Sequence, residues 1–402
     1  MDVRGDTERV RPGWKVSALL RRDVRDIDFG VRRFRLSQGP QREILETASR
    51  AFVTGFNTCL AVRQDDLAAH LAHLGEQQRG HALEGASMAV TMLDLLRCGR
   101  GRRLRALLAG PGASHPYLVL AGAGRGYAAL RRRPRRPGRF PQAGPGTHPA
   151  LYWLTWNGYG FHRAFYDADA TIGDQRAPRR LTAEQRLLFD QGVGRALWFH
   201  EGADPDGVAL RIAEFLPSRH AALWSGAGLA ATYTGGADVA DLGRLAALAG
   251  EHRPSLAHGA ALACAARTHA GAVPPHTAAA AHALTGALAG EAGDWVTTAL
   301  DQIGEQATGT GGYLLWHDAV RDLGRSYHGP VAQPAPPSGS RRPAHGSGPG
   351  AAADPADLAS WDLTRYIPAQ AAEADAPAQA AAGRNAGRRD ASGRPRRENQ
   401  PR

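Results

Sequence analysis

The sequence predicts an all-α fold made of helical hairpins that repeat about every 34 residues. Three observations support this. A glycine-bearing helical block recurs along the 402-residue chain, shorter amphipathic segments with capping residues lie between the blocks, and alternating patterns typical of strands are almost absent. Stacked hairpins of this kind form an α-solenoid or a compact α/α superhelix.

The repeated blocks are ALEGASMAV, LAGAGRGYA, TWNGYGFHR, FDQGVGRAL, LWSGAGLAA and LAHGAALAC. Their first glycines are Gly85, Gly122, Gly158, Gly192, Gly226 and Gly259, at successive intervals of 37, 36, 34, 34 and 33 residues. A glycine costs a helix interior roughly 1 kcal/mol relative to alanine. Small residues also stand two places after each glycine and, except at His162, four places after it. We therefore expect a smooth face that lets another helix approach closely.

The shorter segments are DDLAAHLAHL from Asp65, DPDGVALRIAEF from Asp204 and ADVADLGRLAAL from Ala237, each with an Asp, Pro or Gly-Gly start signal. Each unit is expected to be a helix of about ten residues, a short turn and a glycine-bearing helix of about fifteen. The alternative is a plain multi-helix domain whose Ala-rich and Gly-rich composition mimics a repeat.

Composition divides the chain into an N-terminal arm over residues 1–40, an all-α repeat domain over 41–330 and a tail over 331–402. The tail is rich in Pro, Ala, Gly and Arg and poor in bulky apolar residues, so we expect it to be disordered.

The net charge of +11 raises nucleic acid as a partner. Lys15 is the only lysine, however, and the basic run LRRRPRRPGRF over 130–140 lacks interleaved aromatic residues for base stacking. We expect no nucleic-acid partner. The three cysteines form no metal-ligand spacing, no cofactor motif is found, and no apolar run is long enough to span a membrane. A cytoplasmic protein without metal or cofactor is predicted.

Polar residues immediately precede five of the six repeated glycines. They are Glu84, Asn157, Gln191, Ser225 and His258. Equivalent positions of a solenoid line up along one surface, so these side chains are candidates for a common binding groove, with Arg125 and Arg195 on nearly the same stripe. Alternatively, they hydrogen-bond to neighbouring helices and only connect the repeats.

Aromatic residues gather in WLTWNGYGFHRAFYD over 153–167 and in the following block. Trp153, Trp156, Tyr159 and Trp198 are candidate walls for an extended apolar or conjugated ligand. An ordinary core would have the same composition. For catalysis, Glu84, His162 and Asp190 are the candidate acids or bases, with Arg195 as an electrostatic partner.

The segments RGHALEGASMAV, NGYGFHRAF, FDQGVGRALWFHEGADP, LWSGAGLAATYTGG and LAHGAALACAARTHAG resemble an actinobacterial domain-of-unknown-function family, number 1702. That family occurs in gene cassettes around enediyne polyketide synthases, and the likeness runs from about Leu19 to His328. The resemblance implies a cytoplasmic accessory protein that acts near the conversion of a linear polyene to the enediyne core. It supplies no catalytic residue.

Two functions remain open at this point. The first is an accessory protein whose helical groove binds a polyene or other apolar small molecule, the polyketide synthase or another cassette protein. The second is a cofactor-independent enzyme that shapes or cyclises the polyene with the candidate acids and bases above.

Overall fold

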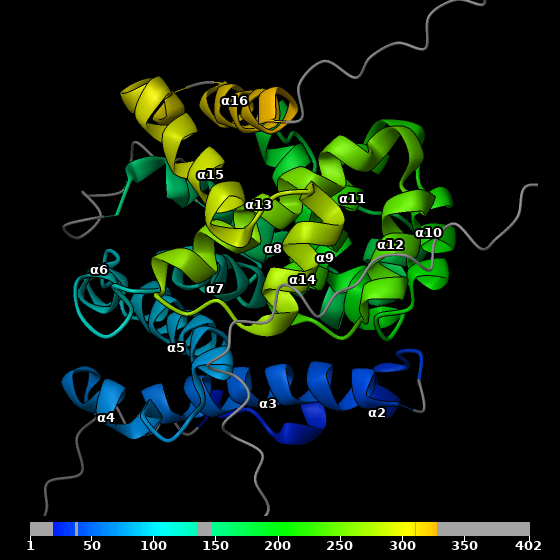
Figure 1. Cartoon of the computed structure of the whole chain (residues 1–402). Coiled ribbons are helices and arrows are strands. Elements are labelled where there is room, and N and C mark those ends of the chain that lie inside the picture. Colours follow the sequence, from blue (N-terminus) through cyan, green and yellow to red (C-terminus); the bar gives the residue numbers. More distant parts are fainter. Residues whose placement is uncertain (1–18, 37–38, 135–146, 310, 328–402) are drawn as a thin grey trace, which may run out of the picture. The chain divides into compact units, whose positions relative to one another are not determined.

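All the regular secondary structure that the computed structural model describes is helical (Figure 1). The structure describes residues 19–36, 39–134, 147–309 and 311–327, and no β-strand occurs among them. The all-α class predicted from the sequence is therefore confirmed. The predicted tail, 331–402, lies outside the described residues.

Long helices pack on one another in chain order, each against the next. They are α3 (Pro40–Ala61), α5 (Glu76–Leu96), α7 (Pro116–Ala129), α8 (Leu154–Tyr166), α9 (Ala183–His200), α11 (Pro217–Thr234), α13 (Arg253–His269) and α15 (Ala289–Ile303). The last helix, α16 (Gly312–Tyr327), packs on α13 and α15.

The glycine column brings these helices into backbone contact. A Cβ built on Gly122 would lie within 3.0 Å of the carbonyl oxygen of Glu84 on the preceding long helix. The same overlap recurs with the carbonyls of Ala121, Asn157, Gln191 and Ser225 at Gly158, Gly192, Gly226 and Gly259, respectively. The second glycine of a block faces the following helix instead, as in Gly124 against Thr155 and Gly160 against Phe189. The helices α7, α8, α9 and α11 thus each present one glycine to the preceding and one to the following long helix, which offsets the helix-propensity cost by close packing.

Short helices connect several of the long ones. These are α4 (Leu67–Leu71), α6 (Arg102–Ala109), α10 (Pro205–Ala213), α12 (Val239–Leu248) and α14 (Pro275–Thr285). The side chain of Asp204 caps α10 and that of Asp238 caps α12, as expected of Asp at a helix start. Since α10 packs on α12 and α12 on α14, these three helices form a second layer.

Two connections differ from the predicted ten-residue helix. Between α7 and α8 the described residues hold only a five-residue 3-10 helix, η4 (Pro149–Trp153), and the segment before α9 holds a π turn, η5 (Asp169–Gly173). The sequence between η5 and α9 has Pro178 and several arginines but no apolar periodicity, so it offers no face for a helix to bury.

Part of the segment expected to be an N-terminal arm belongs to the core. It contains the 3-10 helix η1 (Val24–Ile27) and the single turn α2 (Phe29–Arg32). Ile27, Phe29 and Phe34 are all buried. Phe34 packs edge-on against Phe165, with ring centroids 4.9 Å apart.

Candidate functional site

Four of the five polar residues that precede the repeated glycines form one hydrogen-bonded chain across four consecutive long helices. Asn157 Nδ2 donates to Gln191 Oε1 over 2.8 Å, and Gln191 Nε2 donates to Ser225 Oγ over 2.9 Å. Ser225 Oγ lies 3.0 Å from His258 Nδ1. Their exposed fractions are only 0–3%. The stripe predicted from the sequence is therefore one connected set, but it lies inside the protein rather than along an open groove.

The chain continues to a buried charged centre. Arg195 Nη1 donates to Asn157 Oδ1 over 2.7 Å, and Arg195 Nη2 lies 3.5 Å from Glu84 Oε1. Arg125 Nη1 lies 3.6 Å from the same carboxylate oxygen. Burial opposes ionisation of Glu84, but Arg195 and Arg125 together lower its pKa to about 2. Two guanidinium groups and one carboxylate thus leave a net positive charge in the interior.

Aromatic rings surround this charged centre. The guanidinium of Arg125 lies 3.5 Å from the ring centre of Phe52 and 4.7 Å from that of Phe161, and that of Arg195 lies 4.9 Å from Phe161. Cation–π contacts of this kind stabilise a desolvated guanidinium. The cavity beside Glu84 measures about 20 Å³, which is room for a water molecule but not for an organic substrate.

The other catalytic candidates are buried elsewhere. Asp190 forms a two-pronged ion pair with Arg219, at 2.6 Å and 3.0 Å, and is 1% exposed. His162 is buried against the ring of Tyr166, and burial, reinforced by Arg125 and other arginines, holds its pKa well below the usual value. Neither residue lines the small cavity beside Glu84 or the larger pocket between α13, α14, α15 and α16.

The aromatic ligand-binding candidates are core residues. Trp153 donates through Nε1 to the carbonyl of Ala307, and Trp198 donates to that of Gly235, both over 2.9 Å. Trp156 and Tyr159 are buried with ring centroids 5.6 Å apart. These four aromatic residues therefore lie in the hydrophobic core, which was the alternative to a ligand-binding wall.

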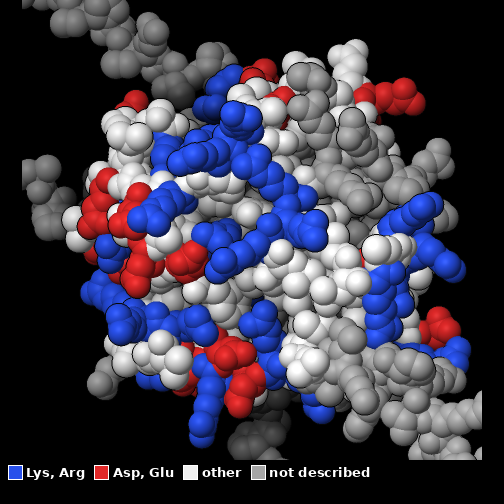
Figure 2. Space-filling view, turned by 180° about the vertical axis from the view of Figure 1, so that it is seen from behind, with Lys and Arg blue, Asp and Glu red and all other residues white. Residues whose placement is uncertain are grey.

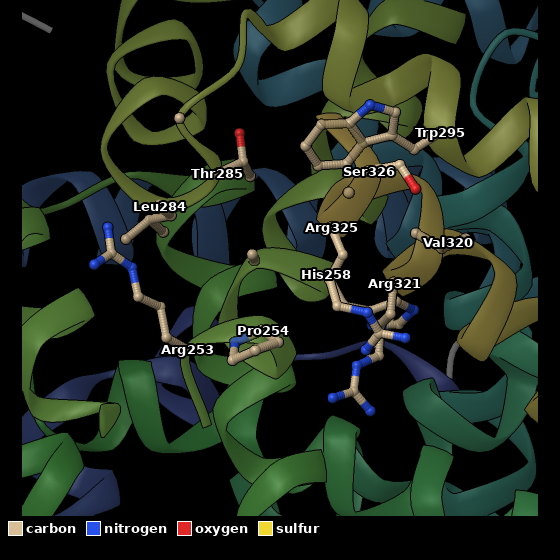
Figure 3. Close-up of a pocket in the computed structure, with 13 residues that line it drawn as sticks. Arg253, Pro254, His258, Leu284, Thr285, Trp295, Val320, Arg321, Arg325 and Ser326 are labelled. Carbon is tan, nitrogen blue, oxygen red and sulfur yellow. The ribbon is translucent and has the colours of Figure 1, made fainter. Parts of the chain in front are cut away.

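A large pocket opens between α13, α14, α15 and α16, with a volume of about 1050 Å³. Its apolar wall includes Pro254, Ala257, Leu284, Trp295 and Val320. His258 from α13 lies beside Arg321 from α16, while Arg253 lies on the opposite side of the pocket (Figure 3). Arg325 completes the basic lining, and no Asp or Glu is among the described residues that line the pocket. One end of the buried hydrogen-bonded chain therefore reaches the pocket wall at His258.

Sequence reasoning found His258 but missed the pocket. The arginines of α16 lie outside the glycine series, and nothing in their spacing pairs them with α13. The strong amphipathic pattern of GYLLWHDAVRDLGRSY was the available signal, because it predicts a helix that covers an apolar surface.

Within the described residues, no cluster of three or more His, Cys, Asp or Glu side chains has the geometry to hold a metal ion. None of the helices in the described part of the chain is both long enough and apolar enough to cross a membrane. Arginines form several bands on the face shown in Figure 2, and acidic side chains lie among or beside them in several places, so the surface charge there is mixed.

A family model described as "Protein of unknown function (DUF1702)" matches residues 13–323. The chain belongs to this family. The match takes in the whole glycine series, the buried charged centre and all but the last part of α16. No curated protein and no solved structure matched the chain.

The family match also covers most of the pocket. The lining residues from Arg253 to Arg321 lie within residues 13–323, and the last three, Gly324, Arg325 and Ser326, follow directly after.

Proposed function

We propose that this family member is a binding protein for an extended, mostly apolar small molecule with a carboxylate or carbonyl end. The observation that carries the proposal is the pocket between α13 and α16. Its volume of about 1050 Å³ is at the upper end of the usual range for ligand sites, roughly 300–1,000 Å³. The buried catalytic candidates have no comparable space beside them.

The pocket lining favours such a ligand. Apolar side chains such as Leu284, Trp295 and Val320 would bury a hydrocarbon chain, and each buried CH₂ contributes about 0.8 kcal/mol. Arg253, Arg321 and Arg325 supply positive charge, and the described part of the lining holds no carboxylate, although Arg325 pairs with Asp322 on its own helix. Arg321 Nε is buried and has no hydrogen-bond partner within the described residues. An anionic or carbonyl oxygen of a ligand would pair with the Arg321 guanidinium.

The resemblance to proteins of enediyne polyketide cassettes suggests the ligand's identity. We infer that the chain binds a linear polyene intermediate in the cytoplasm and presents or protects it for the polyketide synthase or another cassette protein. A polyene released as an acid or a thioester has the conjugated body and oxygen-bearing end that the pocket favours.

We also propose that the series of long helices is an α/α superhelix of repeats of about 34 residues. In five of the six blocks the repeated glycine contacts the carbonyl of the residue just before the previous repeated glycine, and this recurrence supports the interpretation. In this arrangement the repeats form the body of the domain, and α13 together with α14, α15 and α16 forms the pocket at its C-terminal end.

The proposal is tested with cis-parinaric acid, a fluorescent conjugated fatty acid. We expect saturable binding by the full-length protein. Ala257→Trp, at a half-buried position in the pocket wall, should abolish binding, whereas Ala278→Trp at an exposed position of α14 should leave it unchanged. Equal binding by both variants, or no saturable binding by the unmodified protein, would overturn the proposal.

A second variant tests whether the positive charge of Arg321 holds the carboxylate of the ligand. Arg321→Met should weaken binding of the acid about 10- to 100-fold, since a hydrogen bond to a charged group contributes about 1.5–3 kcal/mol. Binding of the corresponding alcohol should change much less. An equal loss for the acid and the alcohol would mean that Arg321 only packs against the ligand.

The hypothesis of a polyene-cyclising enzyme is not favoured. Glu84, His162 and Asp190 are buried away from the pocket, and an acid or base must come within hydrogen-bond distance of its substrate. Mass spectrometry of the polyene after incubation with the protein alone tests this conclusion, because discrete conversion would restore the enzyme hypothesis.

A further inference from the structure

The hydrogen-bonded chain from Arg195 to His258 has a fixed direction, because a guanidinium can only donate. Arg195 Nη1 donates to Asn157 over 2.7 Å, so the Asn157 amide must turn its oxygen toward Arg195. Its NH₂ group then faces Gln191. The oxygen of Gln191 must accept that bond, and its own NH₂ must face Ser225.

The last step transfers this direction to the histidine ring. Ser225 Oγ accepts from Gln191 Nε2, and its only other hydrogen-bond partner within the described residues is His258 Nδ1, at 3.0 Å. The hydroxyl proton of Ser225 therefore points at Nδ1. A nitrogen that accepts this proton carries none of its own.

We infer that the charge of Arg195 fixes His258 as the tautomer with its proton on Nε2, and that this N–H is a hydrogen-bond donor for a ligand in the α13–α16 pocket. Nε2 forms no hydrogen bond with the described residues, and His258 is part of the pocket wall. The ligand group that fits is a carbonyl or carboxylate oxygen.

The surroundings of His258 keep the ring neutral. The ring of His317 on α16 lies 4.3 Å away, centre to centre, and Arg321 is the nearby fixed charge. Burial, followed by these two neighbours, lowers the pKa of His258 well below its usual value. A singly protonated ring can be set in one tautomer by its neighbour, whereas a doubly protonated ring cannot.

The use of this N–H by a ligand rests on the proposed function, but the tautomer does not. The two are therefore tested separately. Long-range ¹⁵N–¹H NMR correlation in the ligand-free, full-length protein identifies which ring nitrogen carries the proton, and a His258→Gln variant assigns the signals. We expect the proton on Nε2.

Asn157→Asp tests whether the chain sets the tautomer. The carboxylate introduced there accepts from both Arg195 and Gln191, so the Gln191 amide turns and presents its oxygen to Ser225. Ser225 then donates to Gln191 and accepts from His258, and the ring proton moves to Nδ1. The new charge lies beside Arg195, in a centre that already has a positive excess.

Asn57→Asp on α3 is the matched control, because it makes the same amide-to-carboxylate change outside the chain and should leave His258 unchanged. If Asn157→Asp does not fold, Ser225→Ala takes its place and should give a mixture of tautomers. A proton on Nδ1 in the unmodified protein, or an unchanged tautomer in folded Asn157→Asp or Ser225→Ala, would overturn the inference. If His258 shows the expected tautomer but the protein does not bind parinaric acid, the proposed function is overturned and the tautomer assignment stands.

Discussion

Arg195 Nη2 on α9 lies 3.5 Å from Glu84 Oε1 on α5, although the two residues are 111 positions apart in the sequence (195 minus 84). This contact joins helices that are not neighbours in the packing series. It also connects the Glu84 carboxylate, through Arg195 and Asn157, to the hydrogen-bonded chain that ends in the pocket wall. The charged centre therefore holds the interior in one arrangement and gives the chain its direction.

The glycine column should tolerate no side chain. Gly192→Ala would place a Cβ within 3.0 Å of the carbonyl oxygen of Asn157, which forces α8 and α9 apart. We expect a loss of about 1–3 kcal/mol or more in the free energy of unfolding. Gly243→Ala in α12 is the control, because nothing lies within 4 Å of its Cβ. That variant should gain about 0.5–1 kcal/mol. Urea unfolding of both variants checks the prediction, which fails if Gly192→Ala is as stable as the unmodified protein.

Removal of the Glu84 charge should destabilise the protein strongly. Glu84→Gln leaves Arg125 and Arg195 buried without a carboxylate, at a cost of about 3–5 kcal/mol at neutral pH. Glu76→Gln, at the exposed start of the same helix, should have little effect. Because the pKa of Glu84 is lowered to about 2, its contribution is complete above its ordinary value near 4.5 and is lost as the pH falls toward 2. Chemical denaturation across this pH range should show that slope in the unmodified protein and not in Glu84→Gln.

Buried histidines should make the protein lose stability in acid at a higher pH than the Glu84 carboxylate does. Burial, followed mainly by Arg267, lowers the pKa of His115 to about 4, and burial lowers that of His200 to about 4 against the opposing hydrogen bond to the Ala164 carbonyl. A depressed histidine pKa stabilises the fold above about 6.5 and loses this effect as the pH falls to 4. Each histidine should contribute on the order of 3 kcal/mol to this loss. His200→Phe should flatten the slope of unfolding free energy against pH, whereas His73→Gln at an exposed position should not.

The Asp190–Arg219 pair should be structural. Asp190→Asn leaves the buried Arg219 guanidinium without its carboxylate, and we expect a loss of about 3–5 kcal/mol in stability. The exposed pair of Asp206 and Arg244 is the matched control, and Asp206→Asn there should give no measurable change. Binding of parinaric acid should be unaffected in Asp190→Asn that remains folded, since Asp190 does not line the pocket. Selective loss of binding without loss of stability would instead place Asp190 in a functional site.

The sequence was informative where backbone geometry repeats. Helical periodicity and the absence of strand patterns predicted the all-α class, and the register of Asn157, Gln191 and Ser225 before their glycines predicted that their side chains share a stripe. The spacing of these residues does not predict whether the stripe faces solvent or the protein interior. That depends on how the series of helices curves, and here Arg195 contacts α5 across the interior.

The pocket was beyond sequence reasoning for a different reason. Ala257 and His258 belong to the last glycine block, but Arg321 and Val320 come from α16, which carries no glycine block. Nothing in the local pattern of either helix specifies the other as its neighbour. The aromatic segment around Trp153 and Trp156 was ambiguous because a ligand wall and a core require the same side chains.

A crystal structure of the full-length protein with cis-parinaric acid would test the central claim most directly. We predict that the hydrocarbon chain lies between α13 and α16 against Trp295 and Val320, with a carboxylate oxygen near His258 and Arg321. A ligand bound elsewhere on the protein, or one whose carboxylate points away from His258 and Arg321, would contradict the assignment of this pocket as the functional site.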